Sequence, residues 1–117
     1  MIFSMRLILR GKPYSTNSLY RRHGHTIYMS KEGRDLKQSY QWQVKSQWKQ
    51  PISKEPLKIA IDLFFPDKKK RDIDNYHKIL LDSMSDIVWK DDSQITEMKV
   101  VKTIDNLDPR IEVEVFT

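Results

Sequence analysis

The chain has 117 residues, enough for one domain but not for two with separate cores, so we expect residues 1–117 to form a single compact domain. It has no cysteine and no apolar run near the roughly 20 residues of a membrane span, which excludes a disulfide framework, a thiolate metal site and a membrane helix. The formal net charge of +5 weakly favours a polyanionic partner such as a nucleic acid.

The N-terminal segment is expected to be a strand and not a leader. Residues 1–6 lack a charged stretch followed by an apolar one, which is not typical of a signal peptide, so we expect a cytoplasmic protein. Residues 2–10 alternate, with the apolar odd positions from Phe3 to Leu9 on one face. This pattern predicts a half-buried strand.

A polar segment over residues 14–25 follows, with two tyrosines and several cations. Two interpretations are open for it. It is either a solvated loop or a nucleic-acid contact loop, in which Arg21 and Arg22 bind phosphates and an aromatic ring is free to stack. Residues 26–29 then predict a short second strand.

Residues 31–49 predict a helix, with Ser30 as its N-cap. Apolar side chains recur at every fourth position and form a stripe along it: Leu36, Tyr40, Val44 and Trp48. Trp42 lies off this stripe, and we expect it to make a partial core contact. A dimer or ligand surface is the alternative for this tryptophan.

Residues 57–65 predict a central strand, because both of its faces carry apolar side chains. The next helix is predicted over residues 73–86. Its apolar residues fall on one face, while Asp74, Lys78 and Asp82 share the opposite face at a spacing of four.

The last third of the chain predicts two more strands. Residues 95–103 form the first, with a bulge because the apolar spacing shifts after Ile95, and residues 111–115 alternate as the second. The order β-β-α-β-α-β-β predicts an α+β fold, a mixed sheet of about four to five strands with two main helices on one face.

The densest charge pattern is a run of four cations that leads directly into two carboxylates. The cations are Lys68, Lys69, Lys70 and Arg71, and the carboxylates are Asp72 and Asp74. Two convergent carboxylates, with waters and a phosphate oxygen, suit Mg²⁺. The cations would then hold a polyanion backbone. On spacing alone, an N-cap at Asp74 and a salt-bridged Asp72 remain the alternative.

Lys78 lies one helical turn beyond Asp74, and it also has two interpretations. It is either the partner in an i, i+4 ion pair or an ammonium group beside a phosphate, where it stabilises charge in the transition state. Asp91 and Asp92, considered alone, indicate a turn.

Several motifs occur in order along nearly the whole chain. They are Pro13-Tyr14-Ser15-Thr16-Asn17-(x)₂-Tyr20, Ser30-Lys31-Glu32-Gly33, Phe65-Pro66-Asp67, Asp72-Ile73-Asp74-Asn75-(x)₂-Lys78, Leu81-Asp82-Ser83-Met84 and Trp89-Lys90-Asp91-Asp92-Ser93-Gln94-Ile95. Each motif is weak, but the ordered set resembles the signature of the RusA family of Holliday-junction resolvases, often carried by prophages.

The resemblance implies a homodimeric endonuclease of recombination and repair that binds four-way DNA junctions. It would cut two strands symmetrically, using Mg²⁺ or Mn²⁺. The family's catalytic, metal-binding carboxylates match Asp72, Asp74 and Asp92, and its essential lysine matches Lys78.

One geometric difficulty concerns Asp92. A helix over residues 73–86 is about 21 Å long, so Asp92 lies past the end that is far from Asp72. Residues 87–91 bridge part of this distance if they are extended. Alternatively, Asp92 comes from the second subunit and the site is composite.

Three other functions compete with junction resolution. A branched-DNA binder without cleavage would bind four-way DNA equally with and without Mg²⁺. A metal-dependent nuclease for flaps or forks would prefer those substrates. A phage structural or interaction protein would leave the acidic and basic positions unexplained.

Overall fold

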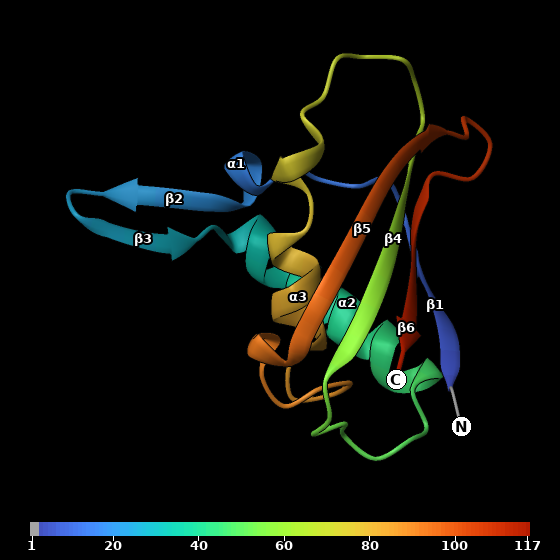
Figure 1. The fold of residues 1–117 in the computed structure, drawn as a ribbon. Coiled ribbons are helices and arrows are strands. Elements are labelled where there is room, and N and C mark those ends of the chain that lie inside the picture. The colour runs from blue at the N-terminus through green and yellow to red at the C-terminus, as the bar shows by residue number, and fades with distance from the viewer. Residues whose placement is uncertain (1–2) are drawn as a thin grey trace.

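The computed structural model describes residues 3–117, so Ile2 of the predicted first strand lies outside the described residues. Four strands form one sheet in the order β1-β6-β4-β5 (Figure 1). They are β1 (Ser4–Arg10), β4 (Leu57–Phe65), β5 (Ile95–Ile104) and β6 (Arg110–Phe116). Because β4 pairs with β5 in parallel and with β6 antiparallel, the sheet is mixed, as predicted.

Strand β4 lies inside the sheet, which confirms the prediction of a central strand. Its odd-numbered residues from Leu57 to Phe65 are all buried, whereas its even-numbered side chains face the other side. The predicted bulge is also confirmed. Leu57 pairs with Ile95 and Lys58 with Glu97, which leaves one extra residue in β5.

Helices α2 (Lys31–Gln47) and α3 (Lys78–Met84) lie on one face of the sheet (Figure 1). The side chain of Ser30 accepts a hydrogen bond from the backbone N–H of Gly33 at 3.0 Å, which confirms the predicted cap of α2. The predicted stripe is also confirmed, since Tyr40, Val44 and Trp48 are buried. Trp42 is 76% exposed, so the prediction of a partial core contact was wrong.

The helix predicted over residues 73–86 is shorter than expected. A 3₁₀ turn, η1 (Ile73–Asn75), comes first, and α3 begins only at Lys78. Asp and Asn favour turns over helix interiors, because their side chains compete for backbone hydrogen bonds. Thr16 Oγ1 also donates to the Asn75 carbonyl at 2.9 Å. The helix ends at Met84, just before Asp86 takes up a left-handed φ of 69°.

Residues 14–25 are not a loop throughout, which corrects the first of the two interpretations. They contain α1 (Thr16–Leu19) and β2 (Tyr20–His23), and β2 pairs with β3 (Thr26–Met29) in a separate two-stranded sheet. Gly24, at φ 61°, turns the chain between them. Figure 1 shows this hairpin projecting from the body of the molecule.

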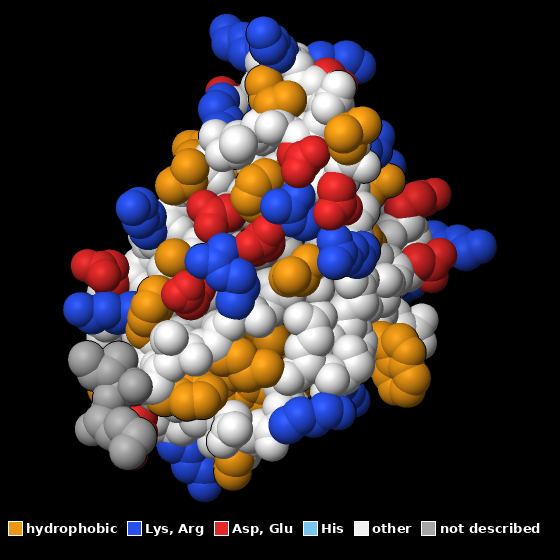
Figure 2. All heavy atoms as spheres, turned by 90° about the vertical axis from the view of Figure 1, so that its right-hand side faces the viewer, with side chains coloured by type: hydrophobic (Ala, Val, Ile, Leu, Met, Phe, Trp, Pro, Cys, Tyr) orange, Lys and Arg blue, Asp and Glu red, His pale blue; other side chains and the backbone are white. Residues whose placement is uncertain are grey.

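The sheet face opposite the helices carries paired charges. Arg6 lies 2.7 Å from Glu112 and 3.0 Å from Glu114, and Arg110 lies 2.6 Å from Glu112. Figure 2 shows acidic and basic side chains interleaved on this side of the molecule. The hydrogen bonds from Arg6 and Arg110 lower the pKa of Glu112. This face therefore offers a polyanion little unpaired positive charge.

The structure thus confirms an α+β fold with a mixed four-stranded sheet and two main helices, and adds a hairpin to it. The homodimer stays a prediction. No helix within residues 3–117 has the length and apolar character needed to cross a membrane.

Candidate active site

The basic segment leaves the end of β4 as an ordered loop. The Asp67 carboxylate accepts a hydrogen bond from the backbone N–H of Lys69 at 3.0 Å and pairs with Arg71 at 2.8 Å; both contacts lower the pKa of Asp67. The guanidinium of Arg71 lies 4.4 Å from the centre of the Phe65 ring, and only 17% of its side chain is exposed. Arg71 therefore holds the loop in shape, whereas the lysines of residues 68–70 are exposed.

Asp72 directly precedes η1 and Asp74 is its middle residue, and both side chains are exposed. Asp72 makes no side-chain cap, and neither carboxylate has an ion-pair partner among residues 3–117. The alternative of a capping Asp74 and a salt-bridged Asp72 is therefore not what the structure shows. Immediately before them, Lys102 Nζ donates to the Arg71 carbonyl at 2.7 Å and fixes the backbone there. These two carboxylates are open to a ligand.

Lys78, the first residue of α3, is paired with the next turn of its own helix. Its Nζ lies 3.6 Å from Asp82 Oδ2 and 5.1 Å from the centre of the Tyr20 ring. The Tyr20 hydroxyl donates to the same oxygen of Asp82 at 2.7 Å. Burial and this hydrogen bond raise the pKa of Tyr20 far above its usual value, so the hydroxyl keeps its proton at neutral pH.

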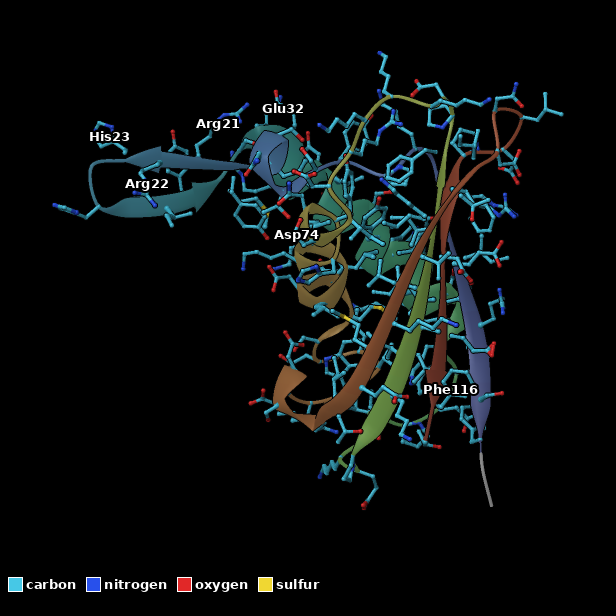
Figure 3. All side chains as sticks on the ribbon, turned by 45° about the horizontal axis from the view of Figure 1, so that its top comes forward. Arg21, Arg22, His23, Glu32, Asp74 and Phe116 are labelled. Carbon is cyan, nitrogen blue, oxygen red and sulfur yellow. The ribbon has the colours of Figure 1, made fainter. Side chains whose placement is uncertain are left out.

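A hollow of about 300 Å³ separates the hairpin from the start of α3. It is lined by Thr16, Asn17, Tyr20, Arg21, Arg22, Ile27 and Lys78. The structure thus places both predicted arginines and the predicted lysine round one cavity, although they lie more than 50 positions apart in the sequence. Figure 3 shows Arg21 and Arg22 on the projecting hairpin and Asp74 near the adjoining end of α3.

Asp92 lies at the opposite end of α3, in a second 3₁₀ turn, η2 (Asp92–Gln94). Asp91 caps this turn, with Gln94 completing a capping box, and Trp89 Nε1 donates to Asp92 Oδ1 at 2.7 Å. A second hollow, of about 460 Å³, opens beside it. Its lining residues are Lys37, Gln41, Lys45, Asp82, Ser85, Asp86, Ile87 and Asp92.

The three predicted metal-binding carboxylates are not brought together within one chain. Helix α3, about 10 Å long, separates Asp72 and Asp74 from Asp92, and η1 and η2 lie at its two ends in Figure 1. Within residues 3–117 no group of three or more potential ligand side chains is close enough to hold a metal ion. The prediction of a three-carboxylate site is therefore not fulfilled by a single copy.

Known proteins support the resemblance seen in the sequence. Residues 10–116 match the family model for Endodeoxyribonuclease RusA. The chain belongs to the RusA family. The crossover junction endodeoxyribonuclease RusA of Escherichia coli K12 is 31% identical over 91 residues, which cover 77% of this chain and 76% of that protein. The corresponding protein of Enterobacteria phage 82 has the same identity and coverage. That of phage HK97 is 30% identical over 93 residues, 79% of this chain and 78% of that protein.

Membership of the RusA family confirms the resemblance, including its link to phages, and shows that the chain is of an endodeoxyribonuclease family. Two residues of this site were visible in the sequence but were given no role there: Tyr20 belongs to one of the family motifs, and Asp82 lies on the polar helix face. The helical spacing of Lys78 and Asp82 was a signal for their pairing. No spacing predicts the contact of Tyr20 with Asp82, because the two residues are 62 positions apart.

Proposed function

We propose that the chain is a metal-dependent endonuclease that resolves four-way DNA junctions by paired, symmetric cleavage in recombination and repair. One observation carries the proposal: a RusA family member presents two carboxylates, Asp72 and Asp74, that pair with no cation of residues 3–117 and lie beside a cation-lined hollow that contains Lys78. The relatives bear the name crossover junction endodeoxyribonuclease. The absence of cysteine suits the reducing cytoplasm as the location.

Junction DNA would approach the hairpin and basic loop, not the outer face of the sheet. Residues 68–70, Arg21 and Arg22 are exposed cations, whereas most charges of the outer face are paired with each other and Lys99 is an exception. Phosphate contacts of this kind supply affinity and position the backbone without reading sequence. Arg71, also predicted to bind DNA, would act mainly by shaping the loop that presents the three lysines.

The donor set fits Mg²⁺, with Mn²⁺ as the alternative. Asp72, Asp74 and Asp92 offer only oxygen, the ligand that these ions prefer in carboxylate sites. When bound, such an ion polarises a phosphodiester and lowers the pKa of an attacking water. The contribution of Lys78 is an ammonium group that stabilises negative charge developing on the phosphate oxygens.

The active site would be composite, formed at the interface of a homodimer. Asp72 and Asp74 of one subunit would act with the Asp92 of the other, because α3 keeps the three apart in a single chain. Two sites related by a two-fold axis suit a junction whose arms have near two-fold symmetry.

The same separation favours a second candidate function. A chain whose carboxylates stay apart would bind branched DNA without cutting it. The two functions differ in metal dependence, because the binder would hold four-way DNA equally with and without Mg²⁺ and leave it intact.

The first test is cleavage of a synthetic mobile four-way junction in Mg²⁺, Mn²⁺ or EDTA, with linear duplex and fork DNA as controls. Metal-dependent paired nicks in opposing strands of the junction are expected. Asp72→Asn and Asp74→Asn should abolish cutting while junction affinity stays equal or rises. Tight binding without nicks in either metal would overturn the nuclease proposal and leave the binder.

Mixed dimers test the composite site. In a heterodimer of Asp72→Asn and Asp92→Asn subunits, a composite arrangement leaves one site intact and ruins the other. An equal mixture should therefore recover about a quarter of the wild-type sites, on statistical pairing of subunits. The product should be single nicks. If the mixture is no more active than either variant alone, Asp92 does not act from the partner.

A further inference from the structure

The position of the Lys78 ammonium group is set by two residues outside the catalytic set. Lysine has a long, flexible side chain, and that of Lys78 is 53% exposed, so packing alone does not fix it. Its Nζ is instead held from two sides. Asp82 Oδ2 lies 3.6 Å away, and the Tyr20 ring lies beneath it with the ring centre at 5.1 Å.

Both contacts converge on a single oxygen atom. The Tyr20 hydroxyl donates to Asp82 Oδ2 at 2.7 Å, and the same oxygen faces Lys78 Nζ. Tyr20 thereby fixes the carboxylate that attracts the ammonium, in addition to contacting the ammonium through its ring. A second lysine–aspartate pair with the same spacing, Lys90 and Asp86, is more exposed, at 66% and 68%.

The backbone on both sides of this cluster is also tied down. Tyr20 follows α1, and Thr16 of α1 donates to the Asn75 carbonyl at 2.9 Å, just before α3 begins. On the other side of the hairpin, the Ser30 N–H donates to the Leu19 carbonyl at 2.8 Å. The start of the hairpin and the start of α3 therefore hold a fixed relative position.

We propose that Tyr20 and Asp82 are positioning residues for Lys78, which hold its ammonium group where the scissile phosphate binds. The inference rests on the proposed function, in which Lys78 stabilises the transition state. Neither positioning residue exchanges a proton with the substrate: the Tyr20 hydroxyl donates to Asp82 Oδ2, and the same oxygen faces the Lys78 ammonium group at 3.6 Å.

The test uses Tyr20→Phe, which removes only the hydroxyl, and Asp82→Asn, which removes the charge. Single-turnover cleavage of a four-way junction at saturating enzyme should slow by about 10- to 100-fold for each, the loss expected for a misplaced catalytic group. Junction affinity in EDTA and the melting temperature should stay near those of the wild type. Asp82→Glu should recover part of the rate.

Matched controls are Tyr28→Phe on the same hairpin and Asp35→Asn on α2. Tyr28 is 48% exposed, and Asp35 is an exposed carboxylate that lines neither of the two hollows described above. Both should cut at the wild-type rate. Loss of cutting in these controls equal to that in the test variants would overturn the inference.

A double-mutant cycle separates this inference from the function on which it rests. If Lys78→Ala cuts normally, the proposed role of the lysine fails. If Lys78→Ala cuts much more slowly than the wild type but Tyr20→Phe and Asp82→Asn both cut at the wild-type rate, only the positioning role fails. If the positioning role holds, adding Asp82→Asn to Lys78→Ala causes no further loss of cleavage rate, because Asp82 acts through the lysine. A further loss shows an independent role and contradicts it. If either Tyr20→Phe or Asp82→Asn folds poorly, the cleavage rate of the other variant tests the inference.

Discussion

The basic loop allows a quantitative prediction, because its four cations do not have equal freedom. The side chains of Lys68, Lys69 and Lys70 are exposed, whereas Arg71 is 17% exposed and bound to Asp67. Each phosphate contact contributes about 0.9 to the slope of log binding constant against log salt concentration. Replacing the three lysines by glutamine should therefore reduce the magnitude of this slope by up to about 3 per chain.

Arg71→Gln should behave differently. It removes an ion pair with Asp67 and a contact with the Phe65 ring, so it should lower the melting temperature. The salt slope should change by less than that of one lysine. Fluorescence anisotropy of a labelled four-way junction in EDTA, over a series of KCl concentrations, measures the slope. Lys58→Gln, on the outer face, is the control. If Arg71→Gln reduced the salt dependence of binding as much as the triple lysine variant does, the distinction between DNA-binding lysines and a loop-shaping arginine would be refuted.

Three further predictions concern the scaffold. Glu112 has a lowered pKa because Arg6 and Arg110 donate hydrogen bonds to it. Its contribution to stability is therefore complete above its unfolded pKa of 4.5 and is lost as the pH falls through the lower folded pKa. Melting temperatures measured from pH 6 downward, at pH values about one unit apart, should fall less for Glu112→Gln than for the wild type. In Gly33→Ala, the new Cβ would lie 2.5 Å from the Leu19 carbonyl oxygen. The free energy of unfolding, measured with urea, should therefore fall by about 1–3 kcal/mol. An unchanged free energy would contradict the close packing at this position. Trp42→Ser should change that free energy by no more than about 0.5 kcal/mol, because the side chain is 76% exposed; a larger loss would show a contact that the structure does not contain.

The sequence predicted most of the fold where hydrophobic periodicity was clean. Strand β4 alternates over nine residues, and α2 begins at a capping serine and carries a stripe of spacing four, so both were located closely. Strand β2 was missed because Tyr-Arg-Arg-His has no apolar alternation. That strand depends on pairing with β3 and on the turn at Gly24, and these are not visible in its own residues.

The site was predicted less completely, for a physical reason. The residue types at Asp72, Asp74 and Lys78 are informative in sequence, because carboxylates and an amine close together indicate chemistry on phosphates. The start of α3 was misplaced, since the local preference of Asp74 and Asn75 for a turn outweighed the helical pattern. Contacts such as Tyr20 with Asp82 depend on tertiary packing across 62 positions, and no periodicity encodes them.

In the proposed mechanism, the arrangement of charges determines where DNA binds and why cutting needs a second copy of the chain. One face of the sheet pairs most of its acids and bases, whereas Arg21, Arg22 and the three lysines of the loop before α3 are exposed and form no ion pair within residues 3–117. The three carboxylates of the proposed metal site are divided between the two ends of α3, so a single copy does not bring them together within residues 3–117. A single chain that met DNA would then bind without hydrolysing it. Cutting would require a second copy, which would couple hydrolysis to the two-fold geometry of a junction and spare ordinary duplex DNA.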